Sequence, residues 1–436
     1  MSQVLIEKNH QTMVAGSYDI IVAGGGPAGV SAAIAAARKG ARTLLVEPLQ
    51  CLGSIWTAGQ LGVIVDSEQK GGIVEELKEE LTRLGAGEAH LVHNRFMYDP
   101  EVMKYVLEKK CQESVVQLYY SARVTDTVQE SDKKITHIIT ESVSGREAWN
   151  AELFIDATGD GTLSYLAGCD YAFGNEDGVG QPMSMLTRIS GVNLDEIRDC
   201  VRIGNEGKKA KSKRIFQKEL EKAGVNTSIG KPALFPLSGD SFILMGDHQY
   251  EKRGSNTVEL TEAIVKARQE IWNIVSGLKS LGGRWKDIYV ASFPDAIGVR
   301  EGRRISGLYT VTKDDIKNCR RHKDGICRVM GPVDVHSLKK EEDKVESDWS
   351  MGVENRGYDI PLRALITKDV PNLFTAGRCI SGDFTAHSSY RVTGDASVLG
   401  ESAGIAAAAC ATGNLNPGTL DFAQMAEKIQ KESGLF

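Results

Sequence analysis

Long apolar blocks alternate with polar, periodic segments along the chain, and this pattern predicts an α/β fold. Residues 18–23, YDIIVA, form an apolar run that predicts a buried strand. Small residues in 30–40 predict a helix that Gly40 ends, and residues 41–48 predict a second strand ending in Glu47. Helical periodicity follows at 72–84 and 99–111. A parallel sheet covered by helices accounts for this alternation.

The next segments have the shorter period of strands. A strand is predicted at 114–120, and three more β-like runs follow at 122–130, 134–142 and 147–156. The middle of this region therefore predicts a small antiparallel meander inserted in a nucleotide-binding fold. Further helices are predicted near 194–222 and 258–281, and a strand followed by a glycine turn at 372–378. A small-residue helix, VLGESAGIAAAACATG, is expected to begin near Gly400.

The sequence GGGPAG lies between the first strand and the first helix, and it contains G-x-G-x-x-G at Gly24, Gly26 and Gly29. In this position the first glycine permits a tight turn, the second lets a pyrophosphate approach the backbone, and the third lets helix pack on strand. The helix N-terminus offers free N–H groups to the phosphates. Glu47 at the next strand end can accept both ribose hydroxyls and disfavours the extra phosphate of NADP. NAD and FAD both remain open, and a plain glycine turn is the alternative.

Composition narrows the function classes. The chain has 436 residues, 41% apolar and 25% charged, which predicts two domains of a soluble globular protein. The net charge is -6 and the basic run at 207–214 stands alone, so we expect a solvated segment there and no nucleic-acid partner. The absence of a secretion signal and of long apolar runs predicts a cytoplasmic protein without a membrane partner.

Cysteine spacing gives no metal or disulfide framework. The eight cysteines include no C-x-x-C pair, and Cys319, His322 and Cys327 fit no common zinc spacing. We therefore expect reduced thiols, no metal, and a charged surface turn at 319–327.

IIVAGGGPAGVSAAIAAARKG, Glu47, FIDATGDG at 154–161 and PNLFTAGRCISG at 371–382 together resemble the glutathione-reductase-like FAD oxidoreductases. The similarity is greatest to the broad FAD-dependent oxidoreductase group, and it covers the first 170 residues, the C-terminal part and a patch near residue 300. Together with the strand-end position of the DATGDG segment, the resemblance implies FAD as cofactor. The expected FAD-binding residues are Gly24, Gly26, Pro27, Ala28, Gly29, Glu47, Val124, Asp156, Gly159, Asp160, Gly377, Arg378, Gly400 and Ala403.

Two features of that superfold are missing. The C-x4-C pair of disulfide reductases is absent, since the corresponding region has only Cys51, and no second glycine motif for NAD(P)H follows a strand. Dithiol chemistry and a separate nicotinamide domain are therefore not expected. Cys51 itself could form a thioether to the flavin or be an inert, buried thiol.

Residues 383–395, DFTAHSSYRVTGD, are expected to form a loop leading into the helix near Gly400, whose N-terminus would stabilise reduced flavin. His387 could exchange protons, because an unperturbed pKa of roughly 6.5 allows both forms near neutral pH. Arg391 could hold an anionic substrate or balance the flavin's charge. Arg300, in an arginine-rich patch with Arg303 and Arg304, could bind an anion, or the patch could form salt bridges to Glu301 or Asp314.

These interpretations combine into one prediction. A discontinuous, Rossmann-like FAD-binding domain of the GR2 type would comprise residues 1–170 and 355–436, with an inserted α+β substrate or cap domain at 171–354. Hydride would pass between a small polar or anionic substrate and flavin N5, with an unidentified electron acceptor or donor. The alternatives are a flavin monooxygenase, since DATGDG is similar to the D-G motif of aromatic hydroxylases, and a non-catalytic flavin-binding sensor. A homo-oligomer is compatible with all three.

Overall fold

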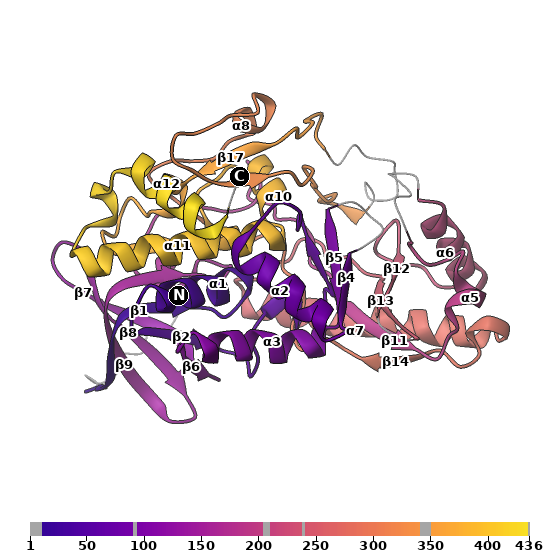
Figure 1. The fold of residues 1–436 in the computed structure, drawn as a ribbon. Helices are drawn as coiled ribbons and strands as arrows, with labels where there is room; N and C mark the ends of the chain where they lie inside the picture. Colours follow the sequence, from indigo (N-terminus) through magenta and orange to yellow (C-terminus); the bar gives the residue numbers. More distant parts are fainter. Residues whose placement is uncertain (1–10, 90–93, 204–209, 238–239, 341–349, 435–436) are drawn as a thin grey trace.

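A seven-stranded sheet forms the centre of the computed structural model, which describes residues 11–89, 94–203, 210–237, 240–340 and 350–434 (Figure 1). The strands run in the order β6-β2-β1-β9-β8-β7, and β18 also pairs with β9. Their bounds are β1 Met13–Ala23, β2 Thr43–Glu47, β6 Gln117–Tyr120, β7 Arg123–Gln129, β8 Ile135–Ser142, β9 Gly145–Asp156 and β18 Leu373–Thr375. The mixed α/β class and the predicted strands are confirmed.

β9 joins the parallel and antiparallel parts of this sheet. One edge of β9 pairs in parallel with β1, and the other pairs first with β8 in antiparallel and then with β18 in parallel. The predicted meander β7-β8-β9 therefore shares its last strand with the nucleotide-binding sheet. As a result, the carboxyl ends of β1, β9 and β18 lie together at one edge, where ligands of open α/β sheets bind.

Helices α1 (Pro27–Arg38) and α11 (Thr393–Gly413) pack against each other over the sheet. A Cβ at Gly400 would lie 1.9 Å from the Ala28 carbonyl oxygen, and one at Gly404 would lie 2.3 Å from that of Ala32. The small residues thus permit this close crossing. The expectation that the helix begins near Gly400 is wrong: α11 begins at Thr393, so Gly400 and Ala403 lie well inside it. Helices α2, α3, α4, α8, α10 and α12 span Gly72–Arg83, Pro100–Glu113, Thr162–Leu166, Lys313–Lys317, Phe384–Tyr390 and Phe422–Ser433.

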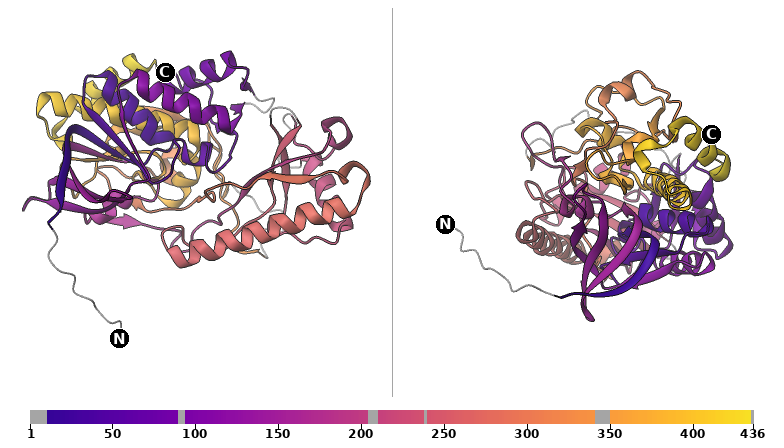
Figure 2. Two further views of the ribbon diagram at one scale, coloured as in Figure 1. Left: turned by 90° about the horizontal axis from the view of Figure 1, so that it is seen from below. Right: turned by 90° about the vertical axis from the view of Figure 1, so that its left-hand side faces the viewer.

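A second, antiparallel sheet lies beside the first, in the order β12-β13-β11-β14 (Figure 1). Its strands are Ala233–Pro236, Ser241–Met245, Leu186–Ser190 and Tyr289–Ser292. The long helix α7 (Thr257–Ser280) packs on it through Ile271 and Ile274 and is visible along this part of the molecule in Figure 2. The helix predicted at 258–281 is confirmed. The one predicted at 194–222 consists of α5 (Leu194–Ile197) and α6 (Lys211–Lys222), while 204–209, including part of the basic run, lies outside the described residues.

Three smaller sheets complete the described strands. They pair β3 (Val63–Val65) and β4 (Gly87–Ala89) with β5 (Arg95–Tyr98), β10 (Tyr171–Ala172) with β15 (Arg304–Ile305), and β16 (Gly325–Val329) with β17 (Tyr358–Pro361). Within the described ranges, no helix is both long enough and apolar enough to cross a membrane. The second sheet is built from residues inside the predicted insertion 171–354, whose exact boundaries stay a prediction.

Candidate functional site

The glycine loop between β1 and α1 forms an open cradle. Gly24 has φ +96°, and a Cβ there would lie 2.7 Å from the Ala157 carbonyl oxygen. A Cβ at Gly29 would lie 1.7 Å from the Gly24 oxygen, so the third glycine lets the helix pack on the loop. At Gly26 a Cβ would meet only the Ser54 Cβ, at 3.4 Å. Gly26 is the N-cap of α1 without a side-chain cap, and Pro27 opens the helix, so the first-turn N–H groups face this open side.

Glu47 lies beside the cradle with its carboxylate fixed by two backbone donors. Gly25 N donates to Oε2 at 2.5 Å and Leu49 N donates to Oε1 at 2.9 Å. Burial raises the pKa of Glu47, which is 4% exposed. Each oxygen keeps a further lone pair, so the group suits two hydroxyl donors. The backbone of the strand that carries Val124 begins beside Glu47. Ala122 N, just before that strand, donates to the Glu47 carbonyl oxygen. The backbone contact of Val124 with an adenine stays a prediction.

Asp156, at the end of β9, organises the loop that follows it. Its Oδ1 accepts from Thr158 N at 3.0 Å, and its Oδ2 accepts from Ser164 N at 2.8 Å. The side-chain hydroxyls of the same two residues also donate to it. The carboxylate is fully buried. Asp156 therefore acts on the site through the loop conformation.

The loop held by Asp156 contacts the turn after β18. Gly159 has φ +75°, and its Cβ position lies 2.5 Å from Arg378 Nη1, so a larger residue would displace the guanidinium. Arg378 Nη2 forms an ion pair with Asp160 Oδ1 at 2.7 Å. Gly377, with φ +80°, lies over Ala28, since a Cβ there would be 3.0 Å from the Ala28 Cβ. The structure thus joins the glycine loop, the DATGDG loop and the 377–378 turn in one place.

Residues 383–395 form helices, so the expectation of a loop is wrong. Asp383 caps α10 by accepting from Ala386 N at 2.7 Å, and α11 begins soon after α10 ends. The N-cap preference of aspartate is the local reason for the extra helix. The segment that leads into α11 is therefore the packed helix α10. His387 lies on α10 and is completely buried.

His387 is surrounded by charge but has no hydrogen-bond partner among the described residues at either ring nitrogen. Its Nδ1 lies 3.7 Å from Glu301 Oε1. Burial, followed by the positive charges of Arg304 and Arg391, holds the pKa of His387 well below its ordinary value. The expectation that it exchanges between both forms near neutral pH is wrong for the free protein, because the imidazole is neutral there. It can accept a proton more readily once negative charge arrives beside it.

Arg391 is the C-cap of α10, and its side chain is largely buried. It donates to the Asp334 carbonyl oxygen at 2.8 Å and to Gln181 Oε1 at 3.2 Å. Its Nε is buried without a hydrogen-bond partner in the part of the chain described. Burial lowers the pKa of Arg391, which remains charged at any physiological pH. A buried guanidinium with spare donors fits an anion.

The three arginines of the arginine-rich patch make different contacts. Arg304 forms an ion pair with Glu301 and also donates to the carbonyl oxygens of Gly382 and Gly174. The predicted salt bridge to Glu301 is therefore confirmed for Arg304. Arg300 donates to the Pro182 carbonyl oxygen at 2.6 Å and to Ser184 Oγ at 2.9 Å.

Arg303 turns to the nucleotide side, donating to the Asp160 carbonyl oxygen at 3.0 Å. The three arginines thus bind backbone from different elements, and Arg300 adjoins the segment that leads into the second sheet.

Sequence reasoning missed the polar residues that complete this chamber. Gln181 donates to Ser388 Oγ at 3.1 Å and its Oε1 accepts from His336 N at 3.0 Å. His336 Nε2 lies 3.2 Å from Asp334 Oδ2, and burial holds the pKa of His336 to about 3. The D-x-H spacing after Gly331 and Pro332 was a usable signal for Asp334 and His336. Gln181 gave none. The chamber is defined here as His387, Arg391, Gln181, Glu301, Arg304, Asp334 and His336.

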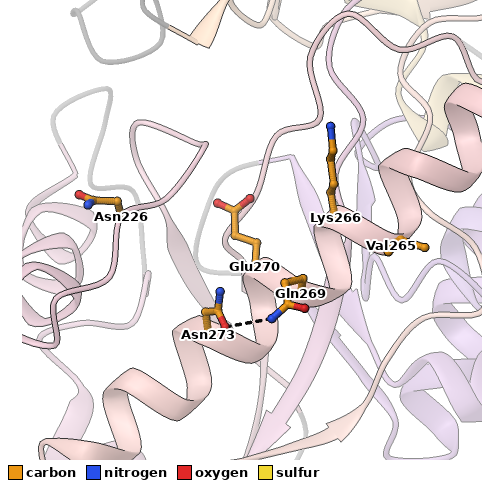
Figure 3. Close-up of a pocket in the computed structure, with 6 residues that line it drawn as sticks. All are labelled: Asn226, Val265, Lys266, Gln269, Glu270 and Asn273. Atoms are coloured by element: carbon orange, nitrogen blue, oxygen red, sulfur yellow. Dashed lines mark hydrogen bonds between the residues drawn. The ribbon is translucent and has the colours of Figure 1, made fainter.

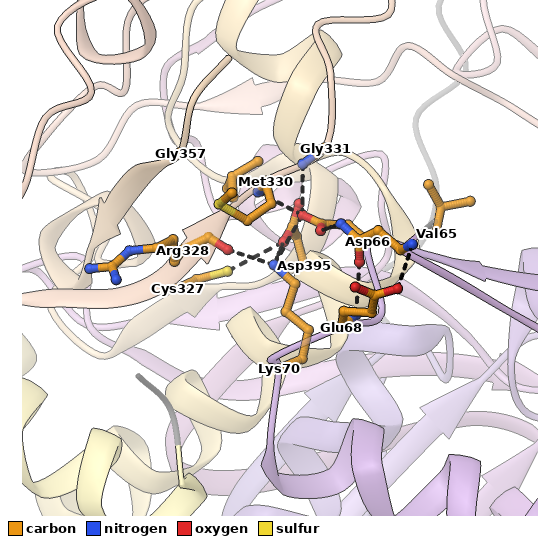
Figure 4. Close-up of polar contacts among 12 residues, drawn as sticks. Val65, Asp66, Glu68, Lys70, Cys327, Arg328, Met330, Gly331, Gly357 and Asp395 are labelled. Atoms are coloured by element: carbon orange, nitrogen blue, oxygen red, sulfur yellow. Dashed lines mark hydrogen bonds and ion pairs between the residues drawn. The ribbon is translucent and has the colours of Figure 1, made fainter. Parts of the chain in front are cut away.

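A buried ion cluster fixes the start of α11 (Figure 4). Lys70 Nζ lies 3.0 Å from Asp66 Oδ2 and 2.6 Å from Asp395 Oδ1, and it donates to the Arg328 carbonyl oxygen at 2.6 Å. A Cβ at Gly394 would lie 2.0 Å from the Asp66 carbonyl oxygen, so the segment after β3 presses on the first turn of α11. Asp395 is therefore a positioning residue for this helix.

The structure also describes the surroundings of Cys51 and of the possible metal ligands. Cys51 is half-buried, 3.9 Å from Thr57 Oγ1, and burial raises the pKa of its thiol, which disfavours a reactive thiolate. Over the described ranges, no group of three or more His, Cys, Asp or Glu side chains is arranged to hold a metal ion.

Comparison with known proteins identifies the family. The sequence profile of the FAD dependent oxidoreductase family matches residues 19–431. No curated protein matches the chain significantly. Solved structures with a similar chain course include p-nitrophenol 4-monooxygenase from Pseudomonas putida (10% identity, 96% of this chain and 89% of that chain, TM-score 0.49).

Two others are a geranylgeranyl bacteriochlorophyll reductase-like protein from Thermoplasma acidophilum (14%, 96% and 83%, 0.45) and an anhydrotetracycline hydroxylase from Streptomyces rimosus (13%, 96% and 67%, 0.46). Similarity at this level extends to neither substrate nor reaction.

The site fits the family's cofactor, FAD. The open side of Gly26 and the uncapped first turn of α1 suit the pyrophosphate, and the oriented carboxylate of Glu47 suits the adenosine ribose. Arg378 and Gly377 lie at the adjoining strand end, in the direction of the chamber.

Proposed function

Because the chain belongs to the FAD-dependent oxidoreductase family, we propose that it transfers hydride between a small anionic substrate and flavin N5, with electrons exchanged with an external acceptor or donor. FAD supplies the hydride chemistry when bound. The protein supplies the position of the substrate, a proton acceptor and compensating charge. The following paragraphs derive these roles from the chamber residues.

The observation that carries the proposal is His387, a fully buried imidazole with two unpartnered nitrogens among guanidinium groups. Arg391 has a spare buried donor and a permanent charge, so it would hold the anionic group of the substrate. That negative charge would raise the depressed pKa of His387 and allow the neutral ring to take the proton from the reacting substrate. Glu301, paired with Arg304, would stabilise the imidazolium so formed.

Residues 171–354 would act as the cap of this reaction. Gln181, Arg300 and Asp334 come from that stretch, whereas His387 and Arg391 come from the C-terminal part. Ligand sites commonly form where two such parts meet. The cap would exclude water and complete the binding of the anion.

The test is anaerobic reduction of bound FAD by small hydroxy- and amino-carboxylates. The rate of flavin reduction is measured after rapid mixing. We expect His387→Ala to reduce the rate about 100- to 10,000-fold, the usual contribution of a general acid or base, with an unchanged flavin spectrum before mixing. His137→Ala, on β8 and remote from the chamber, should reduce like the wild type. An undiminished rate in His387→Ala would reject the assignment.

A second candidate is a flavin monooxygenase, favoured by the DATGDG loop, in which Asp160 is held by Arg378. It predicts no anaerobic reduction by substrate, and oxygen uptake coupled to hydroxylation when a nicotinamide donor is added. A sensor without catalysis predicts neither. Anaerobic reduction by substrate and oxygen uptake coupled to hydroxylation therefore separate the three candidates.

A further inference from the structure

Arg391 is held by the rest of the protein at two places, and both lead to one buried carboxylate, Asp66. The guanidinium donates to the Asp334 carbonyl oxygen at 2.8 Å. The backbone of Arg391 lies between the end of α10 and Val392, the N-cap of α11, so the first turn of α11 fixes where the side chain begins. Two segments from distant parts of the chain therefore place this arginine.

The first route from Asp66 runs through the turn before Asp334. Oδ2 of Asp66 accepts from Met330 N at 2.9 Å and from Gly331 N at 3.0 Å (Figure 4). Only two residues separate Gly331 from Asp334. Asp66 therefore holds the start of a short segment that ends at the acceptor of the Arg391 guanidinium.

Helix α10 contacts the same segment. Ser389 Oγ donates to the Gly331 carbonyl oxygen at 3.2 Å, and Asp334 N donates to the Ser388 carbonyl oxygen at 3.3 Å. Arg391 is the C-cap of α10. The turn that Asp66 holds is therefore bonded to the helix that directly precedes the arginine.

The second route runs through the first turn of α11. Lys70 Nζ lies 3.0 Å from Asp66 Oδ2 and 2.6 Å from Asp395 Oδ1, and all three side chains are buried. The residue before Asp66 adds a further contact, since Val65 N donates to Thr393 Oγ1 at 3.3 Å. The first turn of α11, which directly follows the arginine, is thus tied to Asp66 as well.

The two routes close into a ring. A Cβ at Gly331 would lie 3.6 Å from both Asp66 Oδ2 and Val392 Cγ2, so the turn of the first route lies against the N-cap of the second. Asp66 itself has φ +59°, a left-handed conformation that aspartate and asparagine adopt more readily than other residues with a side chain. Such a conformation persists where the surrounding contacts determine it.

We propose that Asp66 is a positioning residue for Arg391. By holding the 330–331 turn and, through Lys70, the first turn of α11, it fixes where the guanidinium lies in the chamber. The role of Arg391 in holding the anionic group of the substrate rests on the proposed function. The placement of its guanidinium rests on the contacts of the ring alone.

The first test follows the Arg391 Nε–H signal by NMR in FAD-loaded protein that contains isotope-labelled arginine. The signal is assigned by its absence in Arg391→Lys. In Asp66→Asn the side chain keeps its size but has one acceptor oxygen, so it cannot accept both from Asn94 and from the turn donors. We expect the signal to shift and its exchange with solvent hydrogen to become about tenfold faster or more, because the turn opens more easily. An unchanged shift and exchange rate would overturn the proposal.

Two control variants remove comparable contacts elsewhere. Glu219→Gln neutralises a buried carboxylate on α6 that accepts from Trp285 Nε1 at 2.9 Å. Gln269→Ala removes a hydrogen bond to Asn273 Oδ1, 3.3 Å long, on the exposed face of α7 (Figure 3). Both variants should leave the Arg391 signal unchanged. A response in either control as large as that in Asp66→Asn would assign the effect to general loosening of the fold and reject the proposal.

Asn94→Gly keeps the proposal testable if Asp66→Asn does not fold. Asn94 Nδ2 donates to Asp66 Oδ1, and Asn94 has φ +62°, which glycine adopts freely. The charges of Asp66 and Lys70 stay in place, so we expect a smaller response in the same direction, about two- to threefold faster exchange. An unfolded Asp66→Asn together with an unchanged signal in Asn94→Gly would count against the proposal. The flavin spectrum and thermal unfolding of each variant show whether it is folded.

Substrate saturation separates this proposal from the proposed function. With a compound that reduces FAD, Asp66→Asn should raise the concentration at half-saturation about tenfold and change the limiting rate less, since Arg391 holds the anion while His387 takes the proton. If the Arg391 signal responds but no compound reduces FAD, the proposed function alone fails. If compounds reduce FAD but neither the signal nor half-saturation responds, the positioning role alone fails. A signal that responds without any change in half-saturation would support the positioning role and remove Arg391 as the partner of the substrate anion.

Discussion

The nucleotide-binding region and the chamber solve different physical problems. Around Gly24, Gly26 and Gly29 the backbone must come close to itself and to a phosphate, and nearly every contact is a steric limit on residue size. In the chamber, charged groups such as Glu301 and Arg304 are withdrawn from water and must find partners across the fold. The first region is constrained by shape and the second by charge.

This contrast predicts how each region fails. A methyl group added to the nucleotide-binding region meets backbone that cannot move away, so stability should fall at every pH. A charge removed from the chamber or its neighbourhood leaves a partner uncompensated or relieves a desolvated group, so the effect should depend on pH.

The largest expected effect is steric. Gly400→Ala places a Cβ 1.9 Å from the Ala28 carbonyl oxygen, which forces α1 and α11 apart. We expect a loss of about 3 kcal/mol or more in the free energy of unfolding, measured by denaturant titration, together with a loss of bound FAD. Gly413→Ala, near the exposed end of the same helix, should be neutral or stabilising by up to about 1 kcal/mol. Equal stability of both variants would break the steric account.

The next effect comes from a buried acid in the second part of the molecule. Asp247 is fully buried, and burial raises its pKa to about 7. Because the folded state binds the proton more tightly than the unfolded state, stability falls as pH rises from about 4 to about 7. Between pH 5 and 7 the wild type should lose about 2 to 3 kcal/mol that Asp247→Asn does not lose. The measurement is denaturant unfolding at both pH values.

Asp287→Asn, at an exposed position, is the control and should keep the wild-type pH dependence. Parallel pH profiles for Asp247→Asn and the wild type would contradict the charge account of this region.

The smallest effect concerns binding. Glu47→Gln retains the size of the side chain but removes the charge that would accept two ribose hydroxyls. We expect FAD affinity to fall by about 1.5 to 3 kcal/mol, or roughly 10- to 150-fold, in a fluorescence titration of the apoprotein. Glu130→Gln, an exposed glutamate, should bind FAD normally. Unchanged affinity in Glu47→Gln would remove the ribose assignment.

The same contrast explains what the sequence could predict. The glycine spacing, the end of β2 at Glu47 and the strands of the sheet are local patterns, and all of them predicted the observed fold. The start of α11 was misplaced, because its first turn is polar and is fixed by Lys70 and Asp66, which lie far away in sequence. Gln181 was missed for the same reason: its importance comes from contacts with Ser388 and His336 that only folding creates.

The pKa of His387 could not be predicted either. Its depression arises from burial and from guanidinium groups on separate segments, including Arg304 and Arg391. A lone histidine in a sequence gives no sign of such surroundings. The sequence position before α11 was enough to select His387 as a candidate. Its neutral protonation state follows from the fold alone.

The most direct test of hydride transfer is the visible spectrum of the purified, FAD-loaded protein mixed anaerobically with small dicarboxylates and phosphorylated hydroxy acids. Hydride transfer predicts that at least one of these compounds bleaches the flavin without any nicotinamide donor, and that oxidant restores the colour. A flavin that stays oxidised with every compound, while oxygen uptake is coupled to hydroxylation once a nicotinamide donor is added, would contradict the proposal and support the monooxygenase.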